Sequence, residues 1–118
     1  KMTPKEVIQK VQQDLFTMQD LKYRDFHAKL MPTVDKDSVI GVRVPMLRAY
    51  AKKFGKTEEA KQFLEILPHQ YYEENNLHGL LIDQMNDQTD RLLKQLTLRN
   101  LVDSSMEYSQ VGQEMYYI

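Results

Sequence analysis

Residues 39–54 read VIGVRVPMLRAYAKKF. The first part of this stretch is β-branched, which is typical of extended backbone, whereas Pro45 suits the first turn of a helix. Gly55 follows directly and is a common residue just past a helix end. The stretch therefore predicts a short extended segment over 39–44 and a helix over 45–54.

The chain before this stretch predicts two more helices. Thr3 can cap the first one, and Glu6 completes a capping box with it. Apolar residues then follow at helical spacing: Val7, Ile8, Val11, Leu15 and Met18. A second helix is expected over 21–31, because the residue before Pro32 is disfavoured in a helix. The polar residues 33–38 are expected to form a loop.

The chain after Gly55 predicts three further helices. Thr57 can cap the first of them, and Pro68 ends it. Its expected inner face is Ala60, Phe63, Leu64 and Leu67. The other two helices are expected over 71–85 and 89–102. Their expected inner faces are Leu77, Leu80, Leu81 and Met85 in one helix and Leu92, Leu93, Leu96 and Leu101 in the other.

About six helices with short connections predict an all-α fold. Antiparallel helix pairs of this length are typical of a HEAT-like array, an α-solenoid built from repeats of ~40–47 residues. The sequence itself shows no internal repeat. Residues 1–103 are expected to form the helical domain, and residues 104–118, with weak periodicity, a divergent or frayed tail.

Composition indicates a cytoplasmic globular protein. The chain has 118 residues, of which 42% are hydrophobic and 28% charged, and this suits one domain with a real core. It has no cysteine, which excludes disulfides and a thiolate metal site. No apolar run reaches the ~20 residues that span a bilayer, and residues 1–10 lack the apolar core of a signal peptide. We therefore expect no membrane contact.

Basic residues gather at the start of the expected 45–54 helix. Arg48 and Lys52 lie four apart on one face, and Arg43 precedes the positive end of the helix dipole. A helix N-terminus beside arginines can hold a phosphate. The alternative is an ordinary amphipathic helix with a solvated basic side and a buried side made of Met46, Leu47, Tyr50 and Phe54. The net charge of −1 gives no support to nucleic-acid binding.

A second polar cluster lies in residues 67–82. Glu74 and His78 lie four apart on one helix face, but one glutamate and one histidine are too few ligands for a metal. Adjacent glutamates at 73 and 74 would complement a helix N-terminus, and His69 and His78 would be packed or hydrogen-bonded rather than catalytic. No nucleophile elbow, P-loop, dinucleotide or zinc-protease motif occurs. We expect neither a metal nor a cofactor, and the roles of His69, Glu74 and His78 stay open.

Four segments together carry a resemblance to a known family. They read YRDFHAKL over 23–30, MPTV over 31–34, IGVRVPMLR over 40–48 and LPHQYYEENNLHGLLI over 67–82. In this order they resemble the N-terminal part of the DNA alkylation repair (AlkD-type) glycosylases, over about residues 3–87. The resemblance implies a HEAT-like solenoid with a concave basic face. It also implies binding of duplex DNA and excision of alkylated purines, such as 7-methylguanine or 3-methyladenine, without a metal or cofactor.

The resemblance also implies which residues meet DNA. Arg43, Val44 and Arg48 would contact the DNA backbone, and Lys52 and Lys53 would add non-specific attraction.

The catalytic part of the family pattern is missing. Family members carry a tryptophan and, four residues later, an aspartate, shortly after a Val-Asp step; here Val102-Asp103 is followed by Ser105 and Ser109 at those places. Serine cannot stabilise the positive charge that develops on the sugar as a carboxylate does, and the chain has no tryptophan. No catalytic residue is therefore assigned, and whether the chain is an enzyme stays open.

The sequence thus predicts a truncated or degenerate member of this DNA repair family that keeps at most DNA-backbone binding. Family members are longer than this chain, so its last repeat would be uncapped and self-association is expected there. The alternative is a helical scaffold or protein-interaction module with no nucleic-acid role. The near-zero net charge and the apolar residues at 115–118 favour that alternative.

Overall fold

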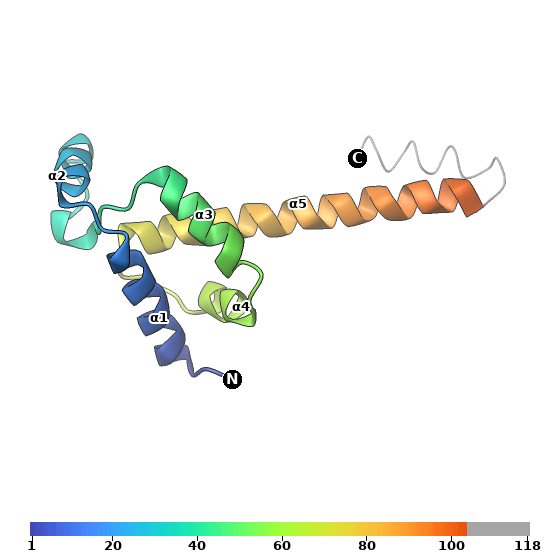
Figure 1. Cartoon of the computed structure of the whole chain (residues 1–118), viewed down its shortest axis with the longest axis horizontal. Helices are drawn as coiled ribbons and strands as arrows, with labels where there is room; N and C mark the ends of the chain where they lie inside the picture. The colour runs from blue at the N-terminus through green and yellow to red at the C-terminus, as the bar shows by residue number, and fades with distance from the viewer. Residues whose placement is uncertain (104–118) are drawn as a thin grey trace. The chain divides into compact units, whose positions relative to one another are not determined.

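A computed structural model describes the backbone of residues 1–103 and the side chains of residues 1–96 (Figure 1). This part of the chain is all-α and contains no β-strand. Its α-helices are α1 (Pro4–Thr17), α2 (Leu21–Leu30), α3 (Val44–Phe54), α4 (Glu58–Glu65) and α5 (Tyr72–Asp103), with a 3-10 helix at Lys36–Ser38. Residues 1–82 form one unit and residues 83–118 a second.

The predicted capping box opens α1. The Thr3 hydroxyl oxygen accepts from the Glu6 backbone N–H at 3.2 Å, and the Glu6 carboxylate accepts from the Thr3 N–H at 3.0 Å. Val7, Val11 and Leu15 on the inner face of α1 are buried. Both the start of this helix and its apolar face are therefore confirmed.

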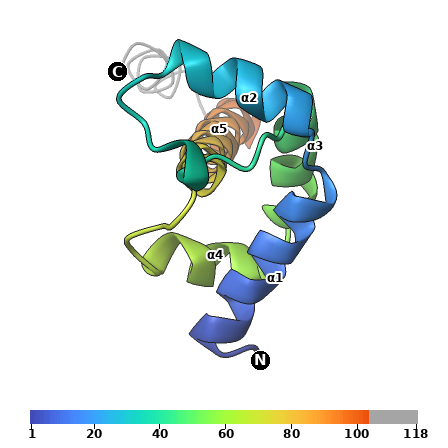
Figure 2. The same cartoon turned by 90° about the vertical axis from the view of Figure 1, so that its left-hand side faces the viewer.

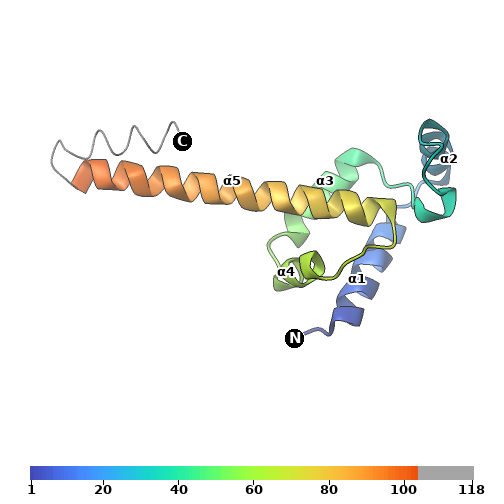
Figure 3. The ribbon, with the colours of Figure 1, turned by 180° about the vertical axis from the view of Figure 1, so that it is seen from behind.

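Helix α2 is the least buried helix of the first unit. Asp20 caps it, because its carboxylate accepts from the Tyr23 backbone N–H at 3.0 Å. The helix ends at Leu30, close to the expected boundary before Pro32, but none of its residues is fully buried. Helices α1 and α4 lie side by side, and α2 lies at the opposite end of this unit from α4 (Figures 2 and 3).

Helix α4 begins after Thr57, as expected, but it ends at Glu65, earlier than Pro68 alone predicts. Ala60 and Phe63 are buried, whereas Leu67 is 64% exposed. The prediction that Leu67 lies on the inner face was therefore wrong. The chain leaves the helix at residue 66 in an extended conformation, so the helical spacing no longer applies at Leu67.

The two helices expected over 71–85 and 89–102 are one helix, α5, so the described chain has five helices where six were predicted. Neither glycine nor proline separates the two expected helices, and the polar residues 86–88 permit a continuous helix. Met85, Leu92, Leu93 and Leu96, expected on inner faces, are exposed. Leu101 and the expected tail at 104–118 lie outside the residues whose side chains are described.

The core of the first unit combines four helices with the segment between α2 and α3. Its buried residues are Val7, Val11, Leu15, Ile40, Val42, Leu47, Ala51, Phe54, Ala60, Phe63, Leu77 and Leu81. Val39 is also buried. The short extended segment predicted at 39–44 is thus a core element, which its β-branched composition favours.

Within the described residues, no helix combines the length and the apolar character that crossing a bilayer requires.

Candidate nucleic-acid interface on helix α3

A buried glutamate of α5 holds the segment that leads into α3. The Glu73 side chain is 1% exposed. Its Oε1 accepts from the Ile40 backbone N–H at 2.9 Å, and its Oε2 accepts from those of Gly41 at 2.8 Å and Val42 at 3.2 Å. Successive N–H groups of this kind form an anion-binding concavity. The chain's own carboxylate occupies it, so these three N–H groups are not a site for phosphate.

Gly41 allows this segment to pass close to α2. Its φ of 95° lies in the left-handed region, which side chains disfavour. A Cβ at Gly41 would lie 2.6 Å from the Arg24 Cβ and 2.7 Å from the Asp20 carbonyl oxygen. The Gly41 carbonyl also accepts from the Asp20 backbone N–H at 2.9 Å. Gly41 and Glu73 together fix the direction in which the chain enters α3.

The N-terminus of α3 is not capped by a side chain. Arg43 is the N-cap residue, and its side chain forms no capping hydrogen bond. The first intrahelical bond joins the Leu47 N–H to the Arg43 carbonyl at 3.0 Å, so the N–H groups of Val44 and Met46 precede it. Val44 is 46% exposed and Met46 44%. This end of α3 presents the positive side of the helix dipole at the surface.

Arg43 already has an acidic partner. Its guanidinium donates to the Asp20 Oδ2 from Nη2 at 3.1 Å and from Nε at 3.2 Å. Its Cζ lies 5.0 Å from the centre of the Tyr23 ring. The Tyr23 backbone N–H, and then Arg43, hold the pKa of Asp20 below its ordinary value. A phosphate at this end of α3 would compete with Asp20 for Arg43.

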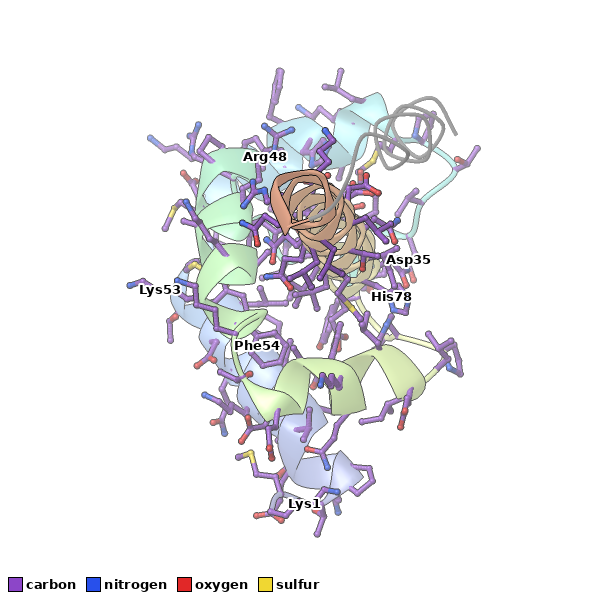
Figure 4. All side chains as sticks on the ribbon, turned by 90° about the vertical axis from the view of Figure 1, so that its right-hand side faces the viewer. Lys1, Asp35, Arg48, Lys53, Phe54 and His78 are labelled. Atoms are coloured by element: carbon purple, nitrogen blue, oxygen red, sulfur yellow. The ribbon has the colours of Figure 1, made fainter. Side chains whose placement is uncertain are left out.

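The other three candidate cations lie farther along α3 and are all exposed. Arg48 and Lys52 lie four residues apart and share a face. Figure 4 shows Arg48 and Lys53 on different sides of α3, as expected for residues ~140° apart on a helix. The structure therefore keeps Arg48 and Lys52 together and separates Lys53 from them.

The opposite side of α3 is anchored in the core. Leu47 and Phe54 are buried, and Tyr50 is half-buried with its hydroxyl donating to the Asp14 carboxylate at 2.7 Å. Burial, together with this hydrogen bond, raises the pKa of Tyr50. Met46 was expected on this side, but it is 44% exposed and lies in the first turn of the helix. Helix α3 is thus amphipathic, with its cations outside.

The two histidines of the polar cluster, His69 and His78, are partly buried in the same unit. The His69 Nε2 and the His78 Nδ1 lie 2.9 Å apart, so one ring donates a hydrogen bond to the other. His69 also stacks on Phe63, with ring centres 4.3 Å apart. The pKa of His69 is lowered, mainly by burial and also by the neighbouring His78. The Glu74 carboxylate opposes this effect but does not outweigh it. The expectation that the histidines are packed and hydrogen-bonded is confirmed.

Glu74 lies within the same cluster and is fully buried. Its Oε1 accepts from the Tyr71 backbone N–H at 3.0 Å and from the Gln12 amide at 3.2 Å. The Glu74 Oε2 and the His69 Nδ1 are buried and have no hydrogen-bond partner among the described residues. In the described part of the chain, no group of three or more histidine or acidic side chains is arranged to hold a metal ion.

Sequence reasoning missed the role of Glu73. Adjacent glutamates at 73 and 74 were expected only to complement the helix N-terminus, and their burial was not predicted: both are buried. No signal in the sequence indicated this role, because Glu73 pairs with backbone N–H groups 31 to 33 residues earlier, and that pairing exists only in the folded chain. Ser105 and Ser109 lie outside the described residues.

A search against models of protein families found no match for this chain, and neither did searches among curated proteins and solved structures.

Proposed function

We propose that residues 1–82 bind the backbone of duplex DNA through the exposed end and outer face of α3. The observation that carries the proposal is the uncapped N-terminus of α3, with Arg43 beside it and Arg48 and Lys52 on one exposed face. Helix N-termini and cations both favour phosphate oxygens. Val44 would contribute its backbone N–H, and Lys53, on another side, only long-range attraction.

The anchoring of this end supports the proposal. Glu73 and Gly41 fix the backbone that enters α3, so a ligand there would meet a preorganised surface. Arg43 is held in place by Asp20 and Tyr23 and would release Asp20, whose side chain is 37% exposed, when a phosphate arrives. The cost of that exchange is small because surface ion pairs contribute little.

A salt titration of binding to a short duplex tests the proposal. We expect the logarithm of the binding constant to fall linearly with the logarithm of salt concentration, with a slope of ~0.9 for each phosphate neutralised. The double variant Arg48→Ala/Lys52→Ala should bind all sequences more weakly. It should also lower that slope by ~1 for each phosphate that the variant no longer neutralises.

A matched control separates the α3 surface from net charge. The variant Lys5→Ala/Lys61→Ala removes the same charge from α1 and α4, where both lysines are exposed. It should leave the slope close to that of the wild-type chain. The α3 interface would be contradicted if both double variants lost the same amount of duplex affinity. It would also be contradicted if the wild-type chain showed no measurable duplex affinity at low salt.

We also propose that this chain is a degenerate cytoplasmic relative of the AlkD-type glycosylases with a HEAT-like arrangement. The segment order over residues 23–82 supports this proposal. Because serines stand where the pattern has Trp and Asp, we expect little or no excision of alkylated purines. Release of 7-methylguanine from methylated duplex DNA, measured by chromatography, checks this; a rate close to that of full-length glycosylases would contradict it.

A second candidate is a protein-interaction module without a nucleic-acid role. Helix α2 favours it, because its apolar residues face outward: Leu21 is 58%, Phe26 62% and Leu30 64% exposed. Neighbouring exposed apolar side chains often mark protein contacts. The duplex titration separates the two candidates, since an interaction module of this kind has no salt-dependent affinity for DNA.

A further inference from the structure

The second unit carries an exposed apolar face on α5. Four residues of this face follow one another at spacings of four, three and four: Met85, Thr89, Leu92 and Leu96. We call them the α5 seam. Met85 is 45% exposed, Leu92 60% and Leu96 55%. Spacings that alternate in this way form the a/d pattern by which helices pair in coiled coils.

Thr89 is the polar member of the α5 seam. Its hydroxyl donates to the Met85 carbonyl oxygen at 3.0 Å. Because the hydroxyl is satisfied within its own helix, it needs no donor or acceptor from a partner. Thr89 can therefore face a partner helix without leaving a polar group unpaired.

The charges around the α5 seam favour pairing with an identical helix. The positions that flank the seam are uncharged: Asn86, Gln88, Leu93 and Gln95. All charged residues within 83–96 lie on the far side of the helix, ~130° or more from the middle of the seam: Asp83, Asp87, Asp90, Arg91 and Lys94. Flanking charges select or reject partners in coiled coils, and within residues 83–96 a second copy meets no like charge.

We infer that the α5 seam pairs with the α5 seam of a second copy of this chain, which forms a symmetric dimer. One self-complementary patch on each copy is the usual basis of such dimers. The seam covers two heptads only, and Arg99 takes the next position of the pattern. The interface is therefore small, and we expect a weak dimer that dissociates on dilution.

Sedimentation equilibrium of the full chain over a wide concentration range tests this inference. The wild-type chain should pass from monomer to dimer, and Leu92→Gln/Leu96→Gln should weaken dimerisation by at least ~100-fold, because both copies lose buried leucines. The control Arg91→Gln/Lys94→Gln changes the outer face of the same turns and should dimerise like the wild-type chain. Far-UV circular dichroism verifies that all three chains are equally helical.

A cross-linking measurement gives a second test that needs no loss of stability. The chain has no cysteine, so Met85→Cys/Leu96→Cys places thiols only at the two ends of the seam. Parallel and antiparallel pairs both bring thiols of two copies together, and mild oxidation should give a covalent dimer. Asp87→Cys/Lys94→Cys, on the opposite face, should stay largely monomeric under the same conditions.

Two results would overturn the inference. One is a wild-type chain that stays monomeric at every concentration. Another partner, such as residues 97–118 or a different protein, would then have to cover the seam. The other is a dimer that forms equally well after Leu92→Gln/Leu96→Gln, because another surface would then hold the copies together.

Discussion

The first and second parts of α5 have similar leucines and use them differently. In residues 72–82, Leu77 and Leu81 are buried in the core of the first unit. In residues 83–96, Leu92 and Leu96 are more than half exposed. The helix itself is continuous across both parts. Apolar spacing therefore predicts a helix and the direction of its apolar face, but not whether another element covers that face.

The acidic residues of α5 show the same difference. Glu73 lies inside the first unit and binds three backbone N–H groups of the segment before α3. Asp87, in the second part, is exposed. A buried carboxylate must be satisfied by the protein, whereas water satisfies an exposed one. The same residue type is thus structural in one part of the helix and solvated in the other.

The largest expected effect is the loss of Glu73. Glu73→Ala leaves three buried N–H groups without an acceptor and should lower the free energy of unfolding by about 3–5 kcal/mol. Urea unfolding, followed by circular dichroism, measures this. Asp87→Ala should change the same quantity by less than ~0.5 kcal/mol. Similar losses in the two variants would show that the two parts of α5 do not differ in this way.

A pair of leucine truncations tests the apolar side of the comparison. Leu77 is fully buried, so Leu77→Ala should cost ~2–5 kcal/mol through lost burial and the cavity that remains. Leu92→Ala, measured at low protein concentration, should cost less than ~0.5 kcal/mol. A large cost for Leu92→Ala in the monomer would mean that this part of α5 is covered within the chain.

Two glycines should respond to alanine with opposite signs. A Cβ at Gly41 meets backbone and Cβ atoms of α2 and its cap at a positive φ, so Gly41→Ala should destabilise by ~2–3 kcal/mol. A Cβ at Gly79, within α5, meets nothing within 4 Å, so Gly79→Ala should stabilise by ~0.5–1 kcal/mol. Thermal unfolding of both variants checks the signs. A Gly41→Ala variant as stable as the wild type would show that the close packing of Gly41 against α2 does not require glycine.

The smallest effect concerns pH. Burial, the first cause, lowers the pKa of His69 below its ordinary value of 6.5 in the folded chain. The unfolded chain then binds more protons, so this contribution to stability is fully present above pH 6.5 and is lost as the pH falls toward the folded pKa.

The variant His69→Gln isolates that contribution. Urea midpoints of the wild type and the variant, compared on both sides of pH 6.5, should differ less at the lower pH. A difference that grows on acidification would mean that His69 is stabilised in its charged form.

Local signals in the sequence predicted most helix ends. The Thr3 and Glu6 capping box and the end of α3 before Gly55 were confirmed, because capping bonds join residues three or four apart. The end of α4 and the break expected near residue 87 were wrong. In the first case the chain turns away early. Near residue 87, the chain has neither glycine nor proline, and the apolar spacing there fits one long helix as well as two short ones.

The candidate interface was only partly predictable. The position of Pro45 and the spacing of Arg48 and Lys52 place those cations on one helix face from sequence alone. The sequence does not reveal that Arg43 pairs with Asp20, because these residues lie 23 positions apart. Nor does it reveal that α2 is exposed, because the burial of a helix depends on which other elements pack against it.

The sequence by itself determined that this protein is helical, where most of its helices begin, and which faces of α1, α3 and α5 are apolar. Those features rest on bonds and spacings within a few residues. Only the tertiary structure decided which apolar faces are covered. It also decided that the Glu73 carboxylate accepts hydrogen bonds from the N–H groups of a segment more than 30 residues away. Burial and long-range hydrogen bonds depend on how the elements pack, and local sequence does not specify that packing.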